Sequence, residues 1–330
     1  MKSNAQWDTA VVRAIRDLTP TVRLFELAPR NGAAAWTPGS HIDIAVDIAG
    51  APDTRSYSLV GEPDAVVYRI AVKRATPSRG GSAWMWRLAV GAEVRIASPE
   101  NHFELGHDSP EYLLIAGGIG ITPLVSMARA LAAHNKNVRM VYAARQRSEL
   151  AFADELGQVL GDRLQTFVDD AGEMIDLKTE FARLHPQAEA YICGPLGLLE
   201  GARQAWSEAD RAAHRLRYET FGASGNFPTE AFWVKVPRHN VEIRVGAEET
   251  LLDALTRAGV PVLSDCRRGE CGLCVLDVAD VRGTIDHRDV FFSAHERASG
   301  HRLCACVSRV VGGGLVLDSA YRDDSASFAA

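Results

Sequence analysis

The sequence predicts a multidomain protein that combines an antiparallel β-barrel, a parallel α/β domain and a small β-rich domain. Three observations favour this: apolar and polar residues alternate up to residue 103, strands alternate with helices beyond residue 101, and a cysteine-rich loop lies near the C-terminus. The length of 330 residues fits two or three compact units at roughly 150 residues each.

Composition excludes several classes of protein. Hydrophobic residues make up 47% and charged residues 24%, which is typical of globular domains and not of disordered, collagen-like or coiled-coil chains. The 36 Lys and Arg residues against 42 Asp and Glu residues leave a net charge of −6. No basic surface for nucleic acid or an anionic membrane is therefore expected, and a small molecule or a protein is the favoured partner.

The chain shows no sign of a transmembrane helix or a signal peptide. Its longest nearly apolar stretch, residues 113–125, is broken by glycines and a proline and falls short of the roughly 20 residues that span a bilayer. We therefore expect a cytoplasmic protein. In the reducing cytoplasm, its six cysteines are expected to be ligands or reactive thiols rather than disulfide partners.

The barrel is predicted from residues 11–103. Apolar and polar residues alternate at 41–48 and 68–73, and Gly- and Pro-containing turn signals separate the apolar runs. Many short strands joined by such turns are typical of an antiparallel barrel.

The α/β domain is predicted from a change of period. Strands are expected at residues 112–116, 138–143, 165–168 and 191–193, and helices at residues 123–134, 151–160 and 197–209. Alternating strands and helices indicate a parallel sheet with right-handed crossovers. The segment 221–229 (FGASGNFPT) is predicted to be an interdomain linker.

The C-terminal domain is predicted to hold a hairpin at residues 232–236 and 241–245 and a helix at 250–258. The cysteine loop follows, and two strands, around Cys306 and at residues 315–317, are expected to close the domain.

Cys266, Cys271 and Cys274 have the spacing C-x4-C-x2-C, which is the plant-type ferredoxin pattern for a [2Fe-2S] cluster. The intervening Gly269 and Gly272 would let backbone N–H groups reach the cluster sulfurs. A structural zinc site is the alternative, but zinc loops favour two separated C-x2-C pairs and the sequence has one.

The fourth thiolate ligand must come from Cys304 or Cys306. Two residues spaced by two on a strand face the same side, so spacing alone does not decide between these cysteines.

These motifs together resemble the phthalate dioxygenase reductase family, which includes vanillate O-demethylase reductases and other class IA partners of Rieske oxygenases. The resemblance rests on R-x-Y-S at residues 55–58, GGIGITP at 117–123, CGP at 193–195 and the cysteine loop, and it covers residues from about 10 to 318. It implies an FMN-binding β-barrel domain at 1–106, an NAD-binding α/β domain at 107–224 and a [2Fe-2S] ferredoxin domain of β-grasp fold at 225–330. The C-V-S-R context of Cys306 implies that Cys306 is the fourth cluster ligand.

The resemblance also implies a flavin site. Arg55 would hold the phosphate, Tyr57 would pack on the isoalloxazine ring and Ser58 would address N5, although Ser58 lies on the opposite strand face from the other two. The remaining predicted contacts are Ile70, Val72 and Lys73 along the ring edge, and Gly80, Gly81 and Ser82, with Arg79, at the phosphate. FMN is expected, and FAD is the alternative.

The nicotinamide site is predicted at two strand-to-helix turns. The first turn contains Gly117, Gly118 and Gly120, and Thr122 is expected to be the N-cap of the next helix with Pro123 at its first position. The second contains Cys193, Gly194 and Pro195 at the carboxyl edge of the sheet, where ligands bind in open α/β sheets.

In the resembled family Thr122 and Cys193 flank the nicotinamide, so Ser58, Thr122 and Cys193 are the catalytic candidates. Arg145 and Arg147 follow a strand where such reductases meet the adenosine ribose, and NADH is expected over NADPH. Phe221 either approaches the flavin or anchors the linker.

These assignments predict an NADH-dependent reductase that passes electrons through FMN and a [2Fe-2S] cluster to a Rieske-type terminal oxygenase, either an aromatic dioxygenase or an O-demethylase. The alternatives are the same chain feeding a diiron hydroxylase, and a non-enzymatic [2Fe-2S] redox sensor. The oxygenase contact is expected to be transient, the chain to be a monomer, and nucleic acid and membrane not to be partners.

Overall fold

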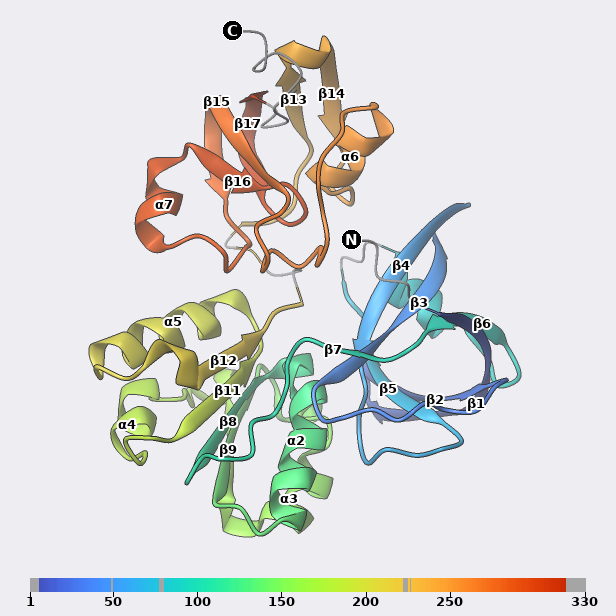
Figure 1. Ribbon diagram of the computed structural model, residues 1–330, viewed down its shortest axis with the longest axis vertical. Helices are drawn as coiled ribbons and strands as arrows, with labels where there is room; N and C mark the ends of the chain where they lie inside the picture. The colour runs from blue at the N-terminus through green and yellow to red at the C-terminus, as the bar shows by residue number, and fades with distance from the viewer. Residues whose placement is uncertain (1–5, 49, 77–79, 222–224, 226, 319–330) are drawn as a thin grey trace, which may run out of the picture. The chain divides into compact units, whose positions relative to one another are not determined.

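In the computed structural model, which describes residues 6–318 except 49, 77–79, 222–224 and 226, the chain forms two compact units (Figure 1). One unit spans Ser3–Glu219 and the other Thr220–Ala330. The first unit contains two sheets and the second contains one. The domain boundaries at 106/107 and 224/225 stay predictions.

The first sheet is antiparallel, as predicted, and has the strand order β4-β3-β6-β1-β2-β5, with β7 paired to β3. Its elements are β1 (Trp7–Thr19), β2 (Val22–Pro29), β3 (Ser40–Ile48), β4 (Ala51–Ser58), β5 (Tyr68–Lys73), α1 (Gly81–Trp86), β6 (Glu93–Ala97) and β7 (Glu100–Asn101). The alternation in β3 buries Ile42, Ile44 and Val46 in the barrel core. The barrel prediction is confirmed.

The second sheet is parallel, also as predicted, with the order β10-β9-β8-β11-β12. Its elements are β8 (Tyr112–Gly117), α2 (Ile121–Ala133), β9 (Val138–Ala144), α3 (Ala153–Leu160), β10 (Leu164–Val168), α4 (Leu177–Ala182), β11 (Glu189–Cys193), α5 (Leu196–Glu208) and β12 (Leu216–Glu219). Every residue of the central strand β8 is buried. The strand order reverses between β8 and β11, which makes this pair the topological switch point of the sheet.

The third sheet has the order β14-β13-β17-β15-β16, in which β13 and β17 run parallel and the other pairs antiparallel. Its elements are β13 (Phe232–Val236), β14 (Val241–Val245), α6 (Leu251–Arg257), β15 (Val275–Asp286), α7 (Ala294–Ser299), β16 (Arg302–Cys304) and β17 (Arg309–Asp318). The side chain of Thr250 caps α6 by accepting from the Asp253 N–H.

One prediction for this sheet is wrong, because Cys306 lies outside the strands. β16 ends at Cys304, and the N–H groups of Val307 and Ser308 both donate to the Cys304 carbonyl. These bonds close a turn between β16 and β17, so the same-side argument for Cys304 and Cys306 does not apply.

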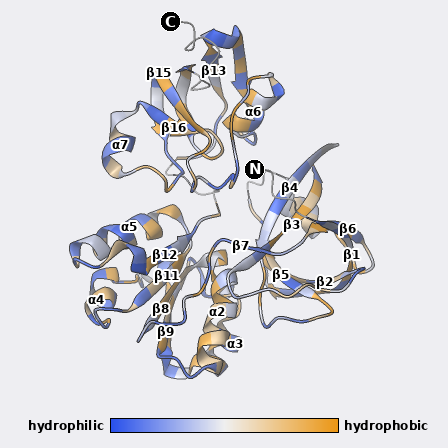
Figure 2. Cartoon of the chain, in the orientation of Figure 1, coloured by the Kyte–Doolittle hydropathy of each residue, from blue (hydrophilic) through white to orange (hydrophobic). Residues whose placement is uncertain are grey.

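The barrel and the α/β domain pack together within the unit Ser3–Glu219. One apolar core contains the barrel residues Leu24 and Val60 together with Leu124 and Phe152 of the α/β domain, and Figure 2 shows the hydrophobic character of α2 and α3. At this boundary the buried Ser126 hydroxyl on α2 donates to the Leu59 carbonyl over 2.8 Å.

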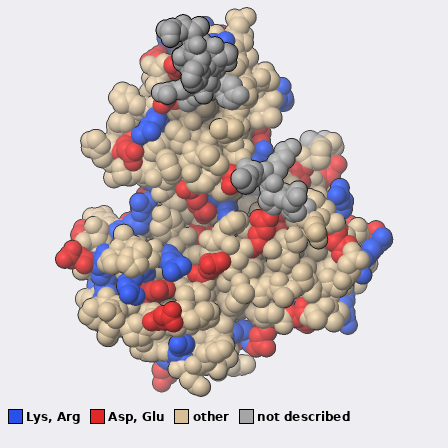
Figure 3. All heavy atoms as spheres, in the orientation of Figure 1, with Lys and Arg blue, Asp and Glu red and all other residues tan. Residues whose placement is uncertain are grey.

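The surface carries both signs of charge. Figure 3 shows basic and acidic side chains interspersed on the visible face. Among the described residues, no helix is long and apolar enough to cross a membrane.

Replacing Ser126 by Ala should lower the free energy of unfolding by about 1–3 kcal/mol, because the buried Leu59 carbonyl would lose a hydrogen bond. Ser207→Ala, on the exposed face of α5, is the control and should change stability by less than about 0.5 kcal/mol. Denaturant titration of both variants measures the difference, and equal stabilities would contradict a structural role for this bond.

Candidate cofactor sites

The two predicted turns of the nicotinamide site lie side by side at the switch point of the parallel sheet. Gly117 ends β8 and Cys193 ends β11, and these strands are hydrogen-bonded neighbours. Ligands of open α/β sheets bind at such carboxyl ends, because the helices on either side of the switch point leave a crevice there.

The two turns approach each other so closely that Gly194 and Gly120 have no room for a side chain. A Cβ atom on Gly194 would lie 3.0 Å from the Gly117 Cα, and one on Gly120 would lie 2.2 Å from the Cys193 carbonyl oxygen. Gly118 differs, because a Cβ there would meet nothing within 4 Å. The turn therefore presents bare backbone on its open side, which a pyrophosphate or nicotinamide can approach.

The predicted capping role of Thr122 is wrong. The 3-10 turn Gly118–Gly120 runs directly into α2, so the helix begins at Ile121 with Gly120 at its N-cap position. Thr122 lies within the first turn of α2 and donates its hydroxyl hydrogen to the Ile119 carbonyl over 3.0 Å. Both Thr122 and Cys193 are buried beside the glycine turn.

Arg145 follows β9 and lies at the same edge of the sheet. Its side chain is 80% exposed, and its Nε is 3.8 Å from a carboxylate oxygen of Asp170. The Asp170 N–H donates to the Arg145 carbonyl, which joins the loops after β9 and β10. A cation and a carboxylate therefore stand together where the sequence predicts the ribose.

The predicted flavin phosphate site brings Arg55 against the start of α1. A Cβ on Gly81 would lie 2.6 Å from Arg55 Nε, so only glycine lets the guanidinium lie over the first turn of this helix. Arg55 also forms an ion pair with Asp53 at 2.6 Å. Ser82 accepts a hydrogen bond from the Ala75 N–H at 3.2 Å. A cation and helix N–H groups are the donors that a phosphate needs.

Arg79 lies outside the described residues, whereas the whole R-x-Y-S motif at residues 55–58 is described. Tyr57 is partly exposed, and burial raises the pKa of its phenol although the Arg55 charge opposes this, so its ring is neutral. Ser58 is buried on the other face of β4. A neutral aromatic face beside a cation suits a flavin ring.

The contacts predicted along β5 are only partly available. Ile70 and Val72 belong to the barrel core, so their side chains are already packed and only their backbone can line a ring. Lys73 lies 3.4 Å from a carboxylate oxygen of Glu149 in the α/β domain and is one-third exposed.

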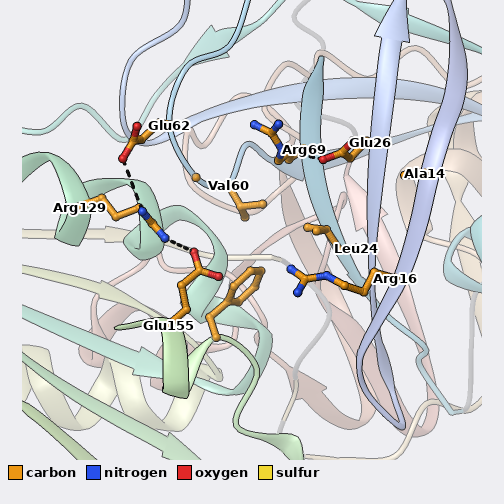
Figure 4. Close-up of a pocket in the computed structure, with 11 residues that line it drawn as sticks. Ala14, Arg16, Leu24, Glu26, Val60, Glu62, Arg69, Arg129 and Glu155 are labelled. Carbon is orange, nitrogen blue, oxygen red and sulfur yellow. Dashed lines mark hydrogen bonds and ion pairs between the residues drawn. The ribbon is translucent and has the colours of Figure 1, made fainter. Parts of the chain in front are cut away.

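A cavity of about 500 Å³ lies elsewhere between the barrel and the helices α2 and α3 (Figure 4). None of the predicted cofactor residues lines it. Arg129 bonds to Glu155 and lies 3.5 Å from Glu62, and Arg69 bonds to Glu26 at 2.9 Å. Two of its three arginines, Arg69 and Arg129, are thus held by carboxylates.

The cysteine loop folds back on its own sulfur atoms. The N–H groups of Arg268 and Cys271 each lie 3.4 Å from the Cys266 sulfur. Gly269, which lies between these two donors, has a φ of +76° that turns the loop back. Such N–H···S bonds stabilise thiolates, and they match the expectation for the loop glycines.

Cys274 stands between Cys304 and Cys306. Hydrogen bonds from the Cys304 and Cys306 thiols, of which the bond from Cys304 has the larger effect, lower the pKa of Cys274 to about 3. The same hydrogen bonds raise the pKa values of Cys304 and Cys306, and burial raises both values further. The negative charge of Cys266 also raises the pKa of Cys306, and the negative charge of Asp289 raises the pKa of Cys304. Cys304 and Cys306 therefore both lie next to Cys274, and both are buried.

The loop is seated on a buried polar network. The Val290 N–H donates to the Gly269 carbonyl, and the Ser308 hydroxyl donates to Asp289. Burial raises the pKa of Asp289, but hydrogen bonds from His287 and Phe292 outweigh this and leave it below its ordinary value. His287 thus acts as structural support within the D-H-R-D stretch.

The supporting role of Ser308 was not predicted, because a hydroxyl side chain gives no sequence signal of burial. Phe221 belongs to the unit Thr220–Ala330 and is 37% exposed, and its approach to the flavin stays a prediction.

Gly269→Ala should reduce the iron and labile sulfide bound per chain severalfold. Gly269 has φ +76°, and its Cβ would lie 2.8 Å from the Asp289 Cα, so the loop would be both strained and displaced. Gly300→Ala is the control, because Gly300 also has a positive φ of 65° but faces open space. Equal cluster content in both variants would show that this close contact is dispensable.

Comparisons with known proteins agree with this arrangement. The family model described as 2Fe-2S iron-sulfur cluster binding domain matches residues 234–311. The family model described as oxidoreductase NAD-binding domain matches residues 114–204. These matches fall on the cysteine-rich unit and on the parallel sheet.

Curated relatives match over nearly their whole length. The chain is 40% identical to a phenoxybenzoate dioxygenase subunit beta of Ectopseudomonas oleovorans, covering 93% of this chain and 96% of the relative. It is 36% identical to a heme-dependent oxidative N-demethylase beta subunit of Ectopseudomonas mendocina, covering 93% and 97%.

Solved structures give the same result. Phthalate dioxygenase reductase, described as a modular structure for electron transfer from pyridine nucleotides to [2Fe-2S], aligns with a TM-score of 0.75 at 30% identity over 94% of this chain and 98% of that one. Full-length CYP116B46 from Tepidiphilus thermophilus aligns with a TM-score of 0.66 at 34% identity. This alignment covers 94% of the present chain and 42% of the longer CYP116B46 chain. The protein is therefore an iron–sulfur flavoprotein oxidoreductase, and it belongs to the phthalate dioxygenase reductase family.

Proposed function

We propose that this chain is the NADH-dependent reductase component of an oxygenase system, and that it passes electrons from NADH through FMN and a [2Fe-2S] cluster to a Rieske-type terminal oxygenase. The observation that carries the proposal is the presence in one chain of a bare glycine turn at a sheet switch point and a thiol loop with N–H···S bonds. When bound, the flavin takes up a hydride as an electron pair and the cluster accepts electrons singly.

In this scheme the side chains position cofactors and transfer no protons. The backbone of Gly117, Gly118 and Gly120, with Gly194 and Pro195, admits the dinucleotide. Thr122 and Cys193 are proposed to flank the nicotinamide, because both are buried beside this turn. The Thr122 hydroxyl is oriented by its bond to the Ile119 carbonyl.

For the flavin, the cradle at Arg55 supports a terminal phosphate. Arg55 lies over Gly81 next to Gly80 and Ser82, and one such cradle is what the single phosphate of FMN requires. We therefore propose FMN over FAD, with Tyr57 against the ring.

For the cluster, we propose Cys266, Cys271, Cys274 and Cys306 as ligands. Cys306 is favoured because its C-V-S-R context resembles the ligand-bearing segment of the family, whereas Cys304 is the last residue of β16 and is fully buried. These thiolates must stay reduced to hold iron, which is the reason to expect a cytoplasmic location.

For the nucleotide, the environment of Arg145 favours NADH. The neighbouring Asp170 carboxylate already engages this guanidinium and would repel a 2′-phosphate. Catalytic efficiency should therefore be higher with NADH than with NADPH, and the reverse ratio would overturn this assignment.

The identity of the protein that accepts the electrons is the least constrained part of this proposal. Two relatives carry names of dioxygenase systems, which supports a Rieske-type partner, and a third is named a subunit of a heme-dependent N-demethylase. A heme-containing oxygenase is therefore the second candidate acceptor. Electron-transfer encounters bury little surface, so a transient contact with a monomeric reductase is proposed in either case.

The reductase function can be tested with artificial acceptors. Purified protein should oxidise NADH over many turnovers with ferricyanide and with cytochrome c, whereas a redox sensor would stop once its own cofactors are reduced. Reconstitution with a Rieske oxygenase and, separately, with a heme-dependent N-demethylase should give product with the Rieske enzyme. Product with the heme enzyme alone would reject the Rieske partner.

Arg55→Ala should weaken FMN binding by roughly tenfold to a hundredfold, because a charge-assisted phosphate bond contributes about 1.5–3 kcal/mol. Fluorescence titration of flavin-free protein measures this change. Arg30→Ala, which removes an exposed barrel arginine, is the control and should leave the affinity unaltered. An unchanged FMN affinity in Arg55→Ala would remove this residue from the phosphate site.

Cys306→Ser should lose or strongly destabilise the cluster while flavin reduction by NADH continues, so turnover should persist with ferricyanide and fall with cytochrome c. Cys304→Ser is the matched control and should keep both the [2Fe-2S] spectrum and both activities. If the two variants exchange phenotypes, Cys304 is the fourth ligand.

A further inference from the structure

Outside the cofactor sites, one group of side chains has the spacing of a metal site. His41, Glu100 and His102 each offer one ligand atom, and these three atoms all lie within 4.8 Å of one another. We propose that they bind one divalent transition-metal ion, with zinc as the representative ion. This proposal is independent of the reductase function.

The backbone explains why the three residues converge. β3 and β7 pair antiparallel, and His41 stands directly opposite Glu100. His102 lies in the bend that follows β7, and this bend brings its ring beside Glu100. Three ligands thus come from two adjoining segments of the barrel edge.

The segment that carries two of these ligands is tied down. The Asn101 side-chain amide donates to the Thr37 hydroxyl at 2.8 Å and to the Pro38 carbonyl at 3.1 Å, and it accepts from the Phe103 N–H at 2.9 Å. Asn101 therefore fixes the backbone between Glu100 and His102. A ligand set held in place before binding loses little entropy when the ion enters.

The donor set selects the kind of ion. Two imidazole nitrogens and one carboxylate oxygen are a combination that zinc uses in open sites, with water at the fourth position. Calcium and magnesium prefer oxygen ligands throughout, so they should bind poorly here.

The site is open to solvent on one side. His41 is buried, whereas the side chains of His102 and Glu100 are 58% and 36% exposed, so an ion can enter from solvent. His102 Nε2 lies 3.4 Å from Glu100 Oε2, which is long for a hydrogen bond. The two imidazole rings are 5.5 Å apart and inclined by 39°.

Isothermal titration of the oxidised, cofactor-loaded protein with zinc chloride tests the proposal. Wild type should bind one zinc ion in the micromolar range, and His102→Ala and Glu100→Gln should each weaken binding at least tenfold. His214→Ala removes an exposed histidine far from this group in sequence and should bind as wild type does. Zinc should raise the melting temperature of wild type and His214→Ala, and should not raise that of His102→Ala.

Three results would overturn the proposal. They are equal zinc affinity in wild type and His102→Ala, magnesium chloride binding as tightly as zinc chloride, and zinc uptake accompanied by loss of iron. The last result would place the zinc at the cluster thiolates. Iron content should therefore be measured before and after each titration.

Discussion

The cysteine loop can present its sulfur atoms only because its backbone passes very close to other segments of the same domain. At Gly269 a side chain would collide with Asp289 and Val307, and at Gly272 it would collide with Phe291. The same close packing lets the main-chain N–H groups of Arg268 and Cys271 point at the sulfur of Cys266. Hydrogen bonds at Asp289 and Val290 support this arrangement of the loop.

The other two cofactor sites also depend on glycines that allow a close approach. Gly120 lets α2 begin against the end of β11, and Gly81 lets a guanidinium lie on the start of α1. In each case the missing side chain exposes N–H groups or admits a cation where negative charge is expected. Backbone, unlike a long side chain, needs little reorganisation when a charged group arrives, so the sites are suited to holding cofactors rather than to proton transfer.

Much of this organisation could be predicted from the sequence, because the periods of the barrel strands and the glycine and cysteine motifs are local signals. β15 was missed, since two register shifts interrupt its alternation, and α4 was missed because six residues give too little periodicity. The role of Thr122 was wrong because a 3-10 turn before α2 cannot be distinguished from a loop by composition. Cys306 was wrongly expected on a strand, because the turn that follows Cys304 gives no signal in the alternation of residues.

The central claim is that electrons pass within this chain from NADH to the iron–sulfur cluster. Anaerobic titration of the purified protein with NADH, followed by EPR spectroscopy, tests it most directly. The account predicts that NADH alone produces the signal of a reduced [2Fe-2S] cluster, in proportion to the flavin and labile sulfide present. A signal that appears with dithionite but never with NADH would contradict it.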